Sequence, residues 1–316
     1  MKIALLGYSG SGKTTIVSAL AGKRHESFDP LKPVLVSVKI HDSRLKAIAD
    51  IVKPQKTTEP EITFVDFKGP QKSTGFDEKV IELAILQDKI ALVVPFYDER
   101  NSVDELGSLY LEMVYRDQER VKNILEKRKQ EILHGKRKKG WEEEILEKCI
   151  NVLEQEKLIL DLEIETQKRV FLGSLGLITT KRFFVIVNGK PDKEVEQACQ
   201  AYGLRFCYID AQNFDKTQLE FFWNEFLKAA GLVRFYTIVG KETRAWLLPE
   251  GSTVLDAAAT IHTDIAAGFV RADVVKYVDF VSLGSFSACR EKGLLKSESK
   301  TGIVNDGDII HIHSTR

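Results

Sequence analysis

The stretch that decides the fold stands near the start of the chain and reads Gly7-Tyr8-Ser9-Gly10-Ser11-Gly12-Lys13-Thr14. It fits the phosphate-binding pattern G-x-x-x-x-G-K-[ST] at every fixed position. An apolar run at residues 3–6 precedes it and predicts a buried strand, and residues 15–20 are expected to continue as a helix. Because this order of strand, loop and helix is the context that a P-loop requires, a chance match in a glycine-rich turn is disfavoured.

The residue types of this loop fit one kind of ligand. Glycines let the backbone wrap closely around phosphate groups, and successive N–H groups and the helix N-terminus supply positive potential. Lys13 is expected to reach the β- and γ-phosphates, and the Thr14 hydroxyl is expected to coordinate Mg²⁺. The expected nucleotide-binding residues of the loop are Gly7, Gly10, Ser11, Gly12, Lys13, Thr14 and Thr15. The sequence therefore predicts that a nucleoside triphosphate, ATP or GTP, binds here with Mg²⁺.

A second element of the same site follows downstream. Residues 61–65 are expected to form a strand, and Asp66-Phe67-Lys68-Gly69 reproduces the D-x-x-G pattern of P-loop switch proteins. Asp66 is expected to contact Mg²⁺ through water, and the Gly69 amide is expected to sense the γ-phosphate. Although D-x-x-G alone mostly marks a turn, its distance from the P-loop favours the switch interpretation. The candidate catalytic residues are Lys13, Asp66 and Gly69, and the candidate metal ligands are Thr14 and Asp66.

The chain contains an altered base-recognition motif after its fourth expected strand. Apolar runs at residues 90–96 and 182–187 predict strands, and the second run ends in Asn188-Gly189-Lys190-Pro191-Asp192. A guanine site usually has an acidic residue three positions after the asparagine, but Pro191 stands there, so guanine specificity is not supported. Asn188 and Asp192 are candidate base contacts, and a turn that closes the strand without touching a base is the open alternative. A further strand is expected at residues 205–209.

Composition limits the class of protein. A length of 316 residues fits two or three domains. Lys plus Arg and Asp plus Glu number 46 each, so any surface that attracts nucleic acid must be local. The four cysteines form no CxxC pair, which favours reduced thiols over disulfides or a zinc site. No apolar run approaches the about 18 residues of a membrane span, so we expect a cytoplasmic protein with no membrane partner.

Between the third and fourth expected strands the pattern becomes helical. Apolar residues recur at helical spacing from residue 104 onward, and a second helical pattern follows a basic turn. We expect an antiparallel helical hairpin whose tip carries Lys136, Arg137, Lys138 and Lys139, with Lys127, Arg128 and Lys129 nearby. This local cluster fits RNA phosphates. The alternative is a solvated tip that keeps the hairpin soluble.

The C-terminal part predicts a small mixed sheet. Short alternating segments at residues 236–239 and 244–248 flank glycine turns, residues 253–262 predict an alanine-rich helix, and residues 309–312 form a last strand. One helix on such a sheet is a β-grasp-like arrangement, and a module of this kind without a catalytic constellation usually binds a partner. His311 and His313 alternate on the terminal strand, where a metal site and an ordinary edge strand are the two alternatives.

The C-terminal segments carry the clearest family resemblance. They include Arg244-Ala245-Trp246, Ala258-Ala259-Thr260-Ile261-His262-Thr263-Asp264, Gly268-Phe269-Val270-Arg271-Ala272-Asp273-Val274 and Asn305-Asp306-Gly307-Asp308. Together with the P-loop and the inserted hairpin, they make essentially the whole chain resemble the YchF branch of the Obg-like NTPases, which ends in a TGS domain. The resemblance implies ATP in preference to GTP, poor hydrolysis, and association with ribosomes or RNA.

The expected fold is an α/β P-loop NTPase domain of the TRAFAC/Obg-like type, with an inserted α-helical hairpin and a C-terminal β-grasp (TGS) domain. Residues 1–103 and 182–232 are assigned to the NTPase domain, 104–181 to the hairpin and 233–316 to the TGS domain. The expected partners are a nucleoside triphosphate and a ribosome or RNA, contacted through the hairpin and the TGS domain.

The sequence departs from the family pattern around the γ-phosphate. Pro30 aligns with the family's switch threonine, Leu83 aligns with a switch histidine, and residues 70–75 replace a longer glycine-rich switch. The family's Asn-x-x-Glu becomes Asn188-Gly189-Lys190-Pro191, so the adenine preference does not carry over. Two hypotheses follow, namely a slow ATPase or GTPase switch and a non-hydrolysing nucleotide sensor. A P-loop kinase that makes nucleotides is disfavoured because nothing in the insertion resembles an acceptor-binding lid.

Overall fold

The computed structural model describes residues 1–22, 33–96 and 102–315. The chain divides into two compact units. The N-terminal unit comprises Lys2–Val36 and Thr63–Phe214, and the C-terminal unit comprises Met1, Ser37–Ile62 and Asp215–Arg316. Each unit contains a sheet with helices packed on it, so the expected α/β fold class is confirmed.

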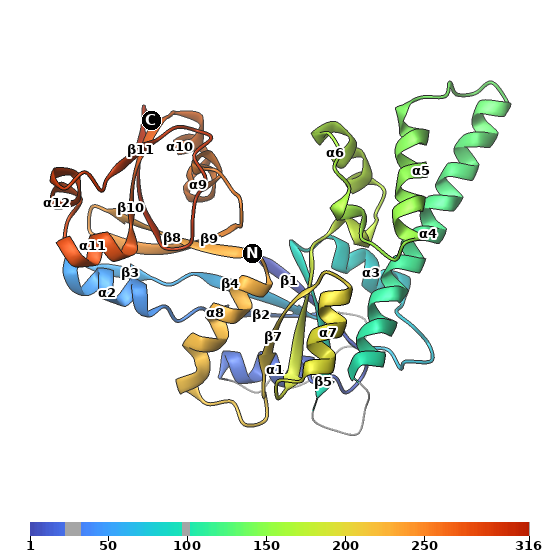
Figure 1. Cartoon of the computed structure of the whole chain (residues 1–316), viewed down its shortest axis with the longest axis horizontal. Helices are drawn as coiled ribbons and strands as arrows, with labels where there is room; N and C mark the ends of the chain where they lie inside the picture. Colours follow the sequence, from blue (N-terminus) through green and yellow to red (C-terminus); the bar gives the residue numbers. More distant parts are fainter. Residues whose placement is uncertain (23–32, 97–101, 316) are drawn as a thin grey trace. The chain divides into compact units, whose positions relative to one another are not determined.

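The N-terminal unit is built on a six-stranded sheet with the order β2-β4-β1-β5-β6-β7 (Figure 1). β1 pairs in parallel with β4 and β5, and β6 pairs in parallel with β5 and β7. The strands are β1 Lys2–Leu6, β2 Val34–Lys39, β4 Glu61–Asp66, β5 Lys89–Phe96, β6 Phe183–Gly189 and β7 Arg205–Ile209. Every residue of β6 is buried, which explains its continuous apolar run because a central parallel strand is covered on both faces. The sequence predicted five of these strands and missed β2.

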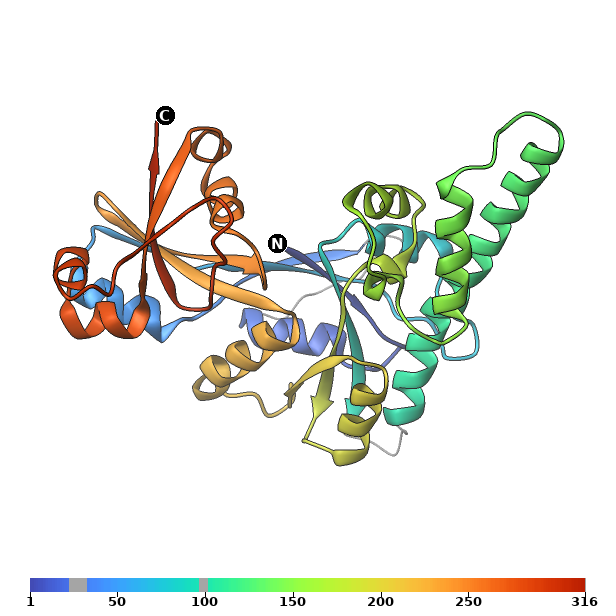
Figure 2. The ribbon, with the colours of Figure 1, turned by 45° about the horizontal axis from the view of Figure 1, so that its top comes forward.

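The helices of this unit include a long antiparallel hairpin (Figures 1 and 2). They are α1 Lys13–Ala21, α3 Glu78–Ile85, α4 Ser102–Leu133, α5 Trp141–Leu153, α6 Thr166–Ser174 and α7 Lys193–Ala201, with short 3-10 helices at Ile159–Asp161 and Ile178–Thr180. Leu109, Met113 and Val121 of α4 join the same core as Leu146 and Cys149 of α5. This shared core is why the two helices stay together beyond the sheet.

The C-terminal unit has its own six-stranded sheet, with the order β11-β10-β12-β8-β9-β3. Its strands are β3 Lys56–Thr58, β8 Leu232–Val239, β9 Glu242–Pro249, β10 Phe269–Lys276, β11 Lys296–Glu298 and β12 Asp308–Ser314. β12 lies between β10, to which it is antiparallel, and β8, to which it is parallel. The expected mixed sheet is present, and β12 is an interior strand of it. Only Asp308 and Ile309 of β12 are in register with β8, whereas His311 and His313 lie farther along the strand, opposite residues of β10.

Helices cover both faces of the C-terminal sheet. They are α2 Ser43–Val52, α8 Leu219–Ala229, α9 Val254–Ile261, α10 Thr263–Ala267, α11 Tyr277–Leu283 and α12 Phe286–Glu291, with a 3-10 turn at Lys216–Gln218. Residues of α9 pack with Phe235 and Leu248 on one face, and residues of α2, α11 and α12 pack with Tyr236 and Ala245 on the other. The prediction of a single helix on this sheet was therefore wrong, because the short segments α10, α11 and α12 are too brief to show a helical period in the sequence.

The segment between the two nucleotide motifs belongs to the C-terminal unit. The Tyr236 hydroxyl donates to Asp42 Oδ2 over 2.6 Å, and the Arg44 guanidinium donates to both carboxylate oxygens of Asp306 at 2.9 and 3.3 Å. Residues 37–62 and 215–231 thus share a unit with the C-terminal sheet. The predicted boundaries instead assign them to the NTPase domain, at residues 1–103 and 182–232. Sequence periodicity identifies a buried helix face but not the core that it joins, so it could not locate this boundary.

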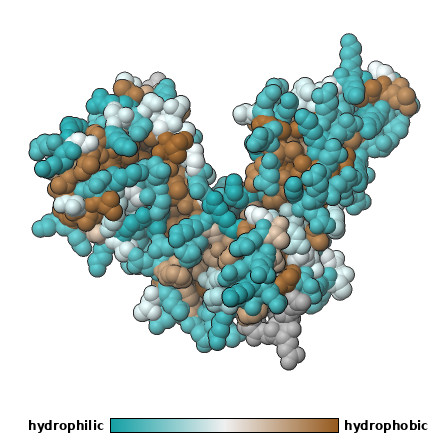
Figure 3. All heavy atoms as spheres, in the orientation of Figure 1, coloured by the Kyte–Doolittle hydropathy of each residue, from teal (hydrophilic) through white to brown (hydrophobic). Residues whose placement is uncertain are grey.

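The face shown in Figure 3 is largely hydrophilic, with several apolar areas, one of them at the end of the hairpin. Leu133, the last residue of α4, is 77% exposed. All four cysteines are buried and free. Within the described ranges, no helix is both long enough and apolar enough to cross a bilayer.

Candidate nucleotide-binding site

The loop between β1 and α1 needs glycine at three positions. Gly10 and Gly12 adopt φ angles of 81° and 88°, in the left-handed region that favours glycine. A Cβ at Gly7 would lie 2.5 Å from the carbonyl oxygen of Val93 on β5, so the loop approaches the sheet too closely for a side chain. Gly12 caps α1 without a side-chain hydrogen bond, which leaves the first amides of the helix available to an anion.

Lys13 is held under this loop. Its Nζ donates to the carbonyl oxygens of Gly7 at 2.7 Å and Tyr8 at 3.1 Å and to Ser11 Oγ at 3.3 Å. The side chain is almost fully buried, and burial lowers the pKa of Lys13 to about 8, although the charges of Asp66 and Glu105 oppose that change. An anion that reached this ammonium group would stabilise its charged form.

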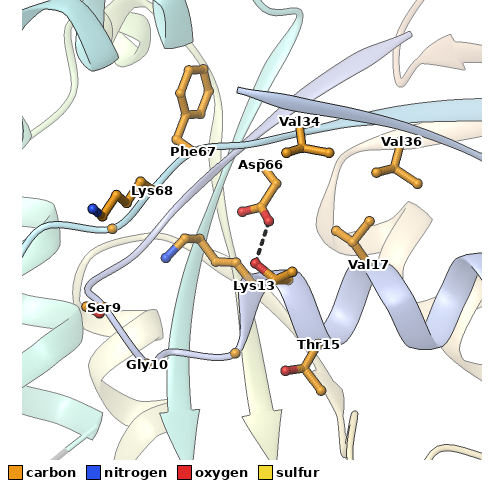
Figure 4. A pocket seen from close by; sticks show the side chains of 13 residues that line it. Ser9, Gly10, Lys13, Thr15, Val17, Val34, Val36, Asp66, Phe67 and Lys68 are labelled. Atoms are coloured by element: carbon orange, nitrogen blue, oxygen red, sulfur yellow. Dashed lines mark hydrogen bonds between the residues drawn. The ribbon is translucent and has the colours of Figure 1, made fainter. Parts of the chain in front are cut away.

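Thr14 and Asp66 meet at the mouth of the loop. The Thr14 hydroxyl donates to Asp66 Oδ2 over 2.7 Å, which joins the start of α1 to the end of β4 (Figure 4). The Asp66 side chain is buried and Thr14 is exposed. The two oxygens that the sequence assigned to one metal ion are thus neighbours.

The segment after Asp66 packs directly on the loop. A Cβ at Gly69 would lie 2.4 Å from the carbonyl oxygen of Gly7 and 2.7 Å from Lys13 Nζ. The Ser9 amide donates to the carbonyl oxygen of Pro70 over 2.8 Å. The D-x-x-G glycine therefore lies next to the P-loop lysine, and the predicted contact of its amide with a γ-phosphate stays a prediction.

A cavity of about 320 Å³ opens beside these residues. The lining residues are Ser9, Gly10, Gly12, Lys13, Thr14, Thr15, Val17, Val34, Val36, Asp66, Phe67, Lys68 and Gly69. In Figure 4 the loop residues Ser9 and Gly10 lie on one side, and Val17, Val34 and Val36 lie on the other. The two valines of β2 were not predicted from the sequence, although the alternating pattern of residues 34–39 is the signal that indicates them.

Comparison with known proteins agrees with these motifs. Residues 232–314 match a family model for the C-terminal domain of YchF GTPases, described as a protein of unknown function (DUF933). The chain is 27% identical to the ribosome-binding ATPase YchF of Buchnera aphidicola over 359 residues, with 98% of each chain covered. It is 24% identical to the protein of the same name from Bacillus subtilis, with 97% of each chain covered.

A solved structure extends the comparison to the whole fold. The Schizosaccharomyces pombe YchF GTPase aligns with a TM-score of 0.75 at 20% identity, over 99% of this chain and 97% of that chain. The chain is a divergent relative of the YchF proteins. The resemblance that the sequence motifs indicated is confirmed, and it spans both compact units.

Asn188 holds three loops of this YchF-like fold together. Its side chain is 2% exposed, its Nδ2 donates to the carbonyl oxygen of Ser11 over 3.3 Å, and its Oδ1 accepts from the Ala211 amide over 3.2 Å. It therefore connects the P-loop to the ends of β6 and β7. Asn188 does not line the cavity beside Lys13, and a base contact by this residue stays a prediction.

Asp192 is the N-cap residue of α7. Its carboxylate caps α7 by accepting from the Glu194 amide at 2.9 Å and the Val195 amide at 3.0 Å. Asp192 does not line the cavity either. These bonds agree with the turn alternative, because they give the carboxylate a structural partner that needs no base.

Three places in the chain were predicted to depart from the family's switch pattern. Leu83 on α3 is partly buried and packs against the core of the N-terminal unit, so an apolar side chain suits that place. Residues 70–75 form a short turn in which the Thr74 amide donates to the carbonyl oxygen of Gln71 over 3.0 Å. Pro30 lies outside the described residues.

The histidine pair of the C-terminal unit lacks the surroundings of a metal site. His313 Nε2 lies 3.0 Å from Asp273 Oδ2, and Arg290 donates to the same oxygen over 3.0 Å. Burial and the neighbouring His313 lower the pKa of His311. Across residues 1–22, 33–96 and 102–315, no three His, Cys, Asp or Glu side chains are grouped so that they could hold a metal ion. The metal alternative for His311 and His313 is therefore unsupported.

Proposed function

We propose that this chain is a nucleotide-binding switch protein that binds ATP or GTP with Mg²⁺, hydrolyses it slowly, and associates with ribosomes or RNA. The observation that carries the proposal is the contact of Lys13 with Gly69 above a complete P-loop, since the two motifs that recognise a γ-phosphate are assembled at one point. The relatives described as ribosome-binding ATPases and the solved YchF GTPase support the same activity. The candidate catalytic residues are Lys13, Asp66 and Gly69.

The residues present fit a magnesium ion. Mg²⁺ prefers oxygen ligands and usually keeps waters and phosphate oxygens, with only one or two protein carboxylates. Thr14 Oγ1 and Asp66 Oδ2 supply a hydroxyl and a carboxylate beside the cavity, which is the donor set that such a site needs. Bound there, Mg²⁺ would neutralise charge on the β- and γ-phosphates.

Slow hydrolysis follows from the residue that replaces the family's switch histidine. The side chain that replaces the family's switch histidine is Leu83, which packs into the apolar core and offers no polar group to a water molecule. Phosphoryl transfer depends on positioning the attacking water and stabilising charge. We therefore expect the chain's own turnover to be slow, and a partner to be needed for faster turnover.

Leu83 also favours the second candidate function, a non-hydrolysing nucleotide sensor in which occupancy alone sets the conformation. Single-turnover hydrolysis of γ-labelled ATP and GTP, with and without added ribosomes, separates the two. Release of phosphate above the rate of a Lys13→Ala control supports the slow hydrolase. Saturable binding without phosphate release under either condition leaves the sensor.

The hairpin tip offers three lysines for a phosphate-rich partner. Arg128 and Arg137 pair with Glu142 and Glu143, so their charges are largely neutralised within the hairpin. Lys136, Lys138 and Lys139 have no ion-pair partner among the residues that the structure describes. Co-sedimentation with purified ribosomes at several salt concentrations tests this part of the proposal. Binding that is absent at every salt concentration would remove the ribosome from the proposal and leave the nucleotide site.

A further inference from the structure

The backbone of Phe76 is held on both sides by the hairpin helix α4. Its amide donates to Glu112 Oε1 over 2.6 Å, and its carbonyl oxygen accepts from Arg116 Nη2 over 2.7 Å. Glu112 and Arg116 stand four residues apart, so both side chains leave the same face of the helix. The segment that follows the D-x-x-G motif is therefore hydrogen-bonded to α4 through both the amide and the carbonyl oxygen of Phe76. We call these three residues the Phe76 clamp.

The clamp also reaches the P-loop. The Tyr8 hydroxyl donates to Glu112 Oε2 over 3.4 Å, and the rings of Tyr8 and Phe76 stack with their centroids 6.2 Å apart. Both rings are 5% exposed. Glu112 thus contacts a P-loop side chain with one carboxylate oxygen and the Phe76 amide with the other. Burial makes these bonds harder to replace with water.

The residue before the clamp has a backbone conformation that favours glycine. Gly75 adopts a φ of 65°. A Cβ there would lie 2.9 Å from Glu112 Oε1, so a side chain at this position would have to displace the Glu112 carboxylate. Gly75 therefore allows the backbone before Phe76 to lie close to α4.

The other end of the same segment lies on the phosphate-binding loop. Pro70 accepts the Ser9 amide, and a group as small as a methyl at Gly69 would collide with Lys13 Nζ. Gly69 therefore lies against the P-loop lysine, where a γ-phosphate is expected to bind. We expect a γ-phosphate bound to Lys13 to displace the Gly69–Pro70 end, whereas a diphosphate lacks the group that would do so.

We infer that the Phe76 clamp couples the γ-phosphate site to the inserted hairpin, because residues 69–76 are anchored to the P-loop at one end and to α4 at the other. This inference rests on the proposed nucleotide binding. Movement of the Gly69–Pro70 end pulls on the hydrogen bonds between Phe76 and α4, so that α4 must shift or those bonds must weaken. Linkage makes this coupling reciprocal. If triphosphate changes the hairpin's affinity for a partner by some factor, that partner changes the affinity for triphosphate by the same factor. Glu112 and Arg116 are positioning residues, since they act through Phe76.

The test compares the affinities of triphosphates and diphosphates in clamp variants of the full chain. Non-hydrolysable β,γ-imido analogues of ATP and GTP, and ADP and GDP, are titrated with Mg²⁺ against wild type, Glu112→Ala, Arg116→Ala and Glu112→Gln. The matched control is Glu119→Ala, which removes the same charge from an exposed position of α4 without touching Phe76. Thermal unfolding of each variant identifies any that fails to fold, and the remaining clamp variants then carry the test.

Loosening the clamp lowers the cost of moving the segment, so the alanine variants should favour triphosphate over diphosphate by about fivefold or more relative to wild type. Glu112→Gln keeps an acceptor for the Phe76 amide, so its ratio of triphosphate to diphosphate affinity should lie between those of wild type and the alanine variants. The ratio for Glu119→Ala should match that of wild type. Triphosphate should also change hydrogen exchange in α4 of wild type but not of Glu112→Ala. An unchanged affinity ratio overturns the coupling while nucleotide binding stands. Failure of wild type to bind any nucleotide overturns the proposed function itself.

Discussion

The Thr14 hydroxyl donates a hydrogen bond of 2.7 Å to Asp66 Oδ2, and it thereby joins the first turn of α1 to the end of β4. These two oxygens are the protein's candidate ligands for Mg²⁺. Because metal binding would replace the direct bond between them, the magnesium dependence of nucleotide affinity reports on this pair.

Thr14→Ala should weaken binding of triphosphate in the presence of Mg²⁺ by about tenfold, equivalent to about 1.4 kcal/mol, because one oxygen ligand is lost. Calorimetric titration with Mg²⁺ and with a chelator measures the effect. Ser18→Ala, on the same helix, serves as the control. If the affinity in chelator falls as much as the affinity in Mg²⁺, the hydroxyl does not act through the metal.

The lowered pKa of Lys13 predicts how affinity depends on pH. Burial lowers the pKa of the free protein's Lys13 to about 8, and a bound polyphosphate favours the charged ammonium group. Binding should therefore take up protons near pH 8. The affinity should be nearly constant below pH 7 and fall by up to about tenfold per pH unit well above pH 8.

Titration between pH 6.5 and 9.5, in buffers of different ionisation enthalpy, measures both the affinity and the proton uptake. Lys13→Arg provides the comparison, because a guanidinium group stays charged over this range. A wild-type affinity that is flat up to pH 9.5 would show that the ammonium group does not meet the phosphates.

The bonds of Asp192 predict its effect on base preference. Since its carboxylate caps α7, Asp192→Ala should lower the free energy of unfolding by about 1 kcal/mol, whereas Asp192→Asn should preserve it. Neither change should alter the ratio of GTP to ATP affinity. Thermal unfolding and competition binding measure the two effects. A selective loss of GTP affinity in Asp192→Asn would show that Asp192 contacts the base.

The lysines of the hairpin tip predict the salt dependence of ribosome or RNA binding. Replacing Lys136, Lys138 and Lys139 with alanine should weaken binding and flatten the plot of log affinity against log salt concentration, by about one unit of slope for each lost phosphate contact. Lys122→Ala is the control, because Lys122 is exposed on α4 but pairs with Glu154. An unchanged slope in the triple variant would assign these lysines to solubility.

The sequence predicted the parts of the fold that depend on local pattern. The P-loop, the strand before it and the helix after it were readable because fixed residue types at fixed spacing have few structural alternatives. β5 and β6 were readable because buried parallel strands give continuous apolar runs. The long hairpin was readable because α4 keeps a helical period over 32 residues.

The parts that the sequence did not predict depend on contacts between distant segments. Nothing in the pattern of α2 shows that Arg44 binds Asp306, 262 residues later. This contact is one reason why α2 belongs to the C-terminal unit and not to the NTPase domain, to which the sequence assigned it. The Phe76 clamp likewise depends on Glu112 and Arg116, which read in the sequence as ordinary charged positions of an exposed helix face. Long-range polar contacts of this kind leave no period, and only the folded chain identifies them.

The central claim is that the amides of Gly7–Thr14, with Lys13 behind them, hold a nucleoside triphosphate. Calorimetric titration of wild type and Lys13→Ala with ATP and GTP in Mg²⁺ tests it most directly. The account predicts saturable binding at one site, weakened by at least about 30-fold in the variant, or about 2 kcal/mol. No heat at millimolar nucleotide, or equally tight binding by Lys13→Ala, would contradict it.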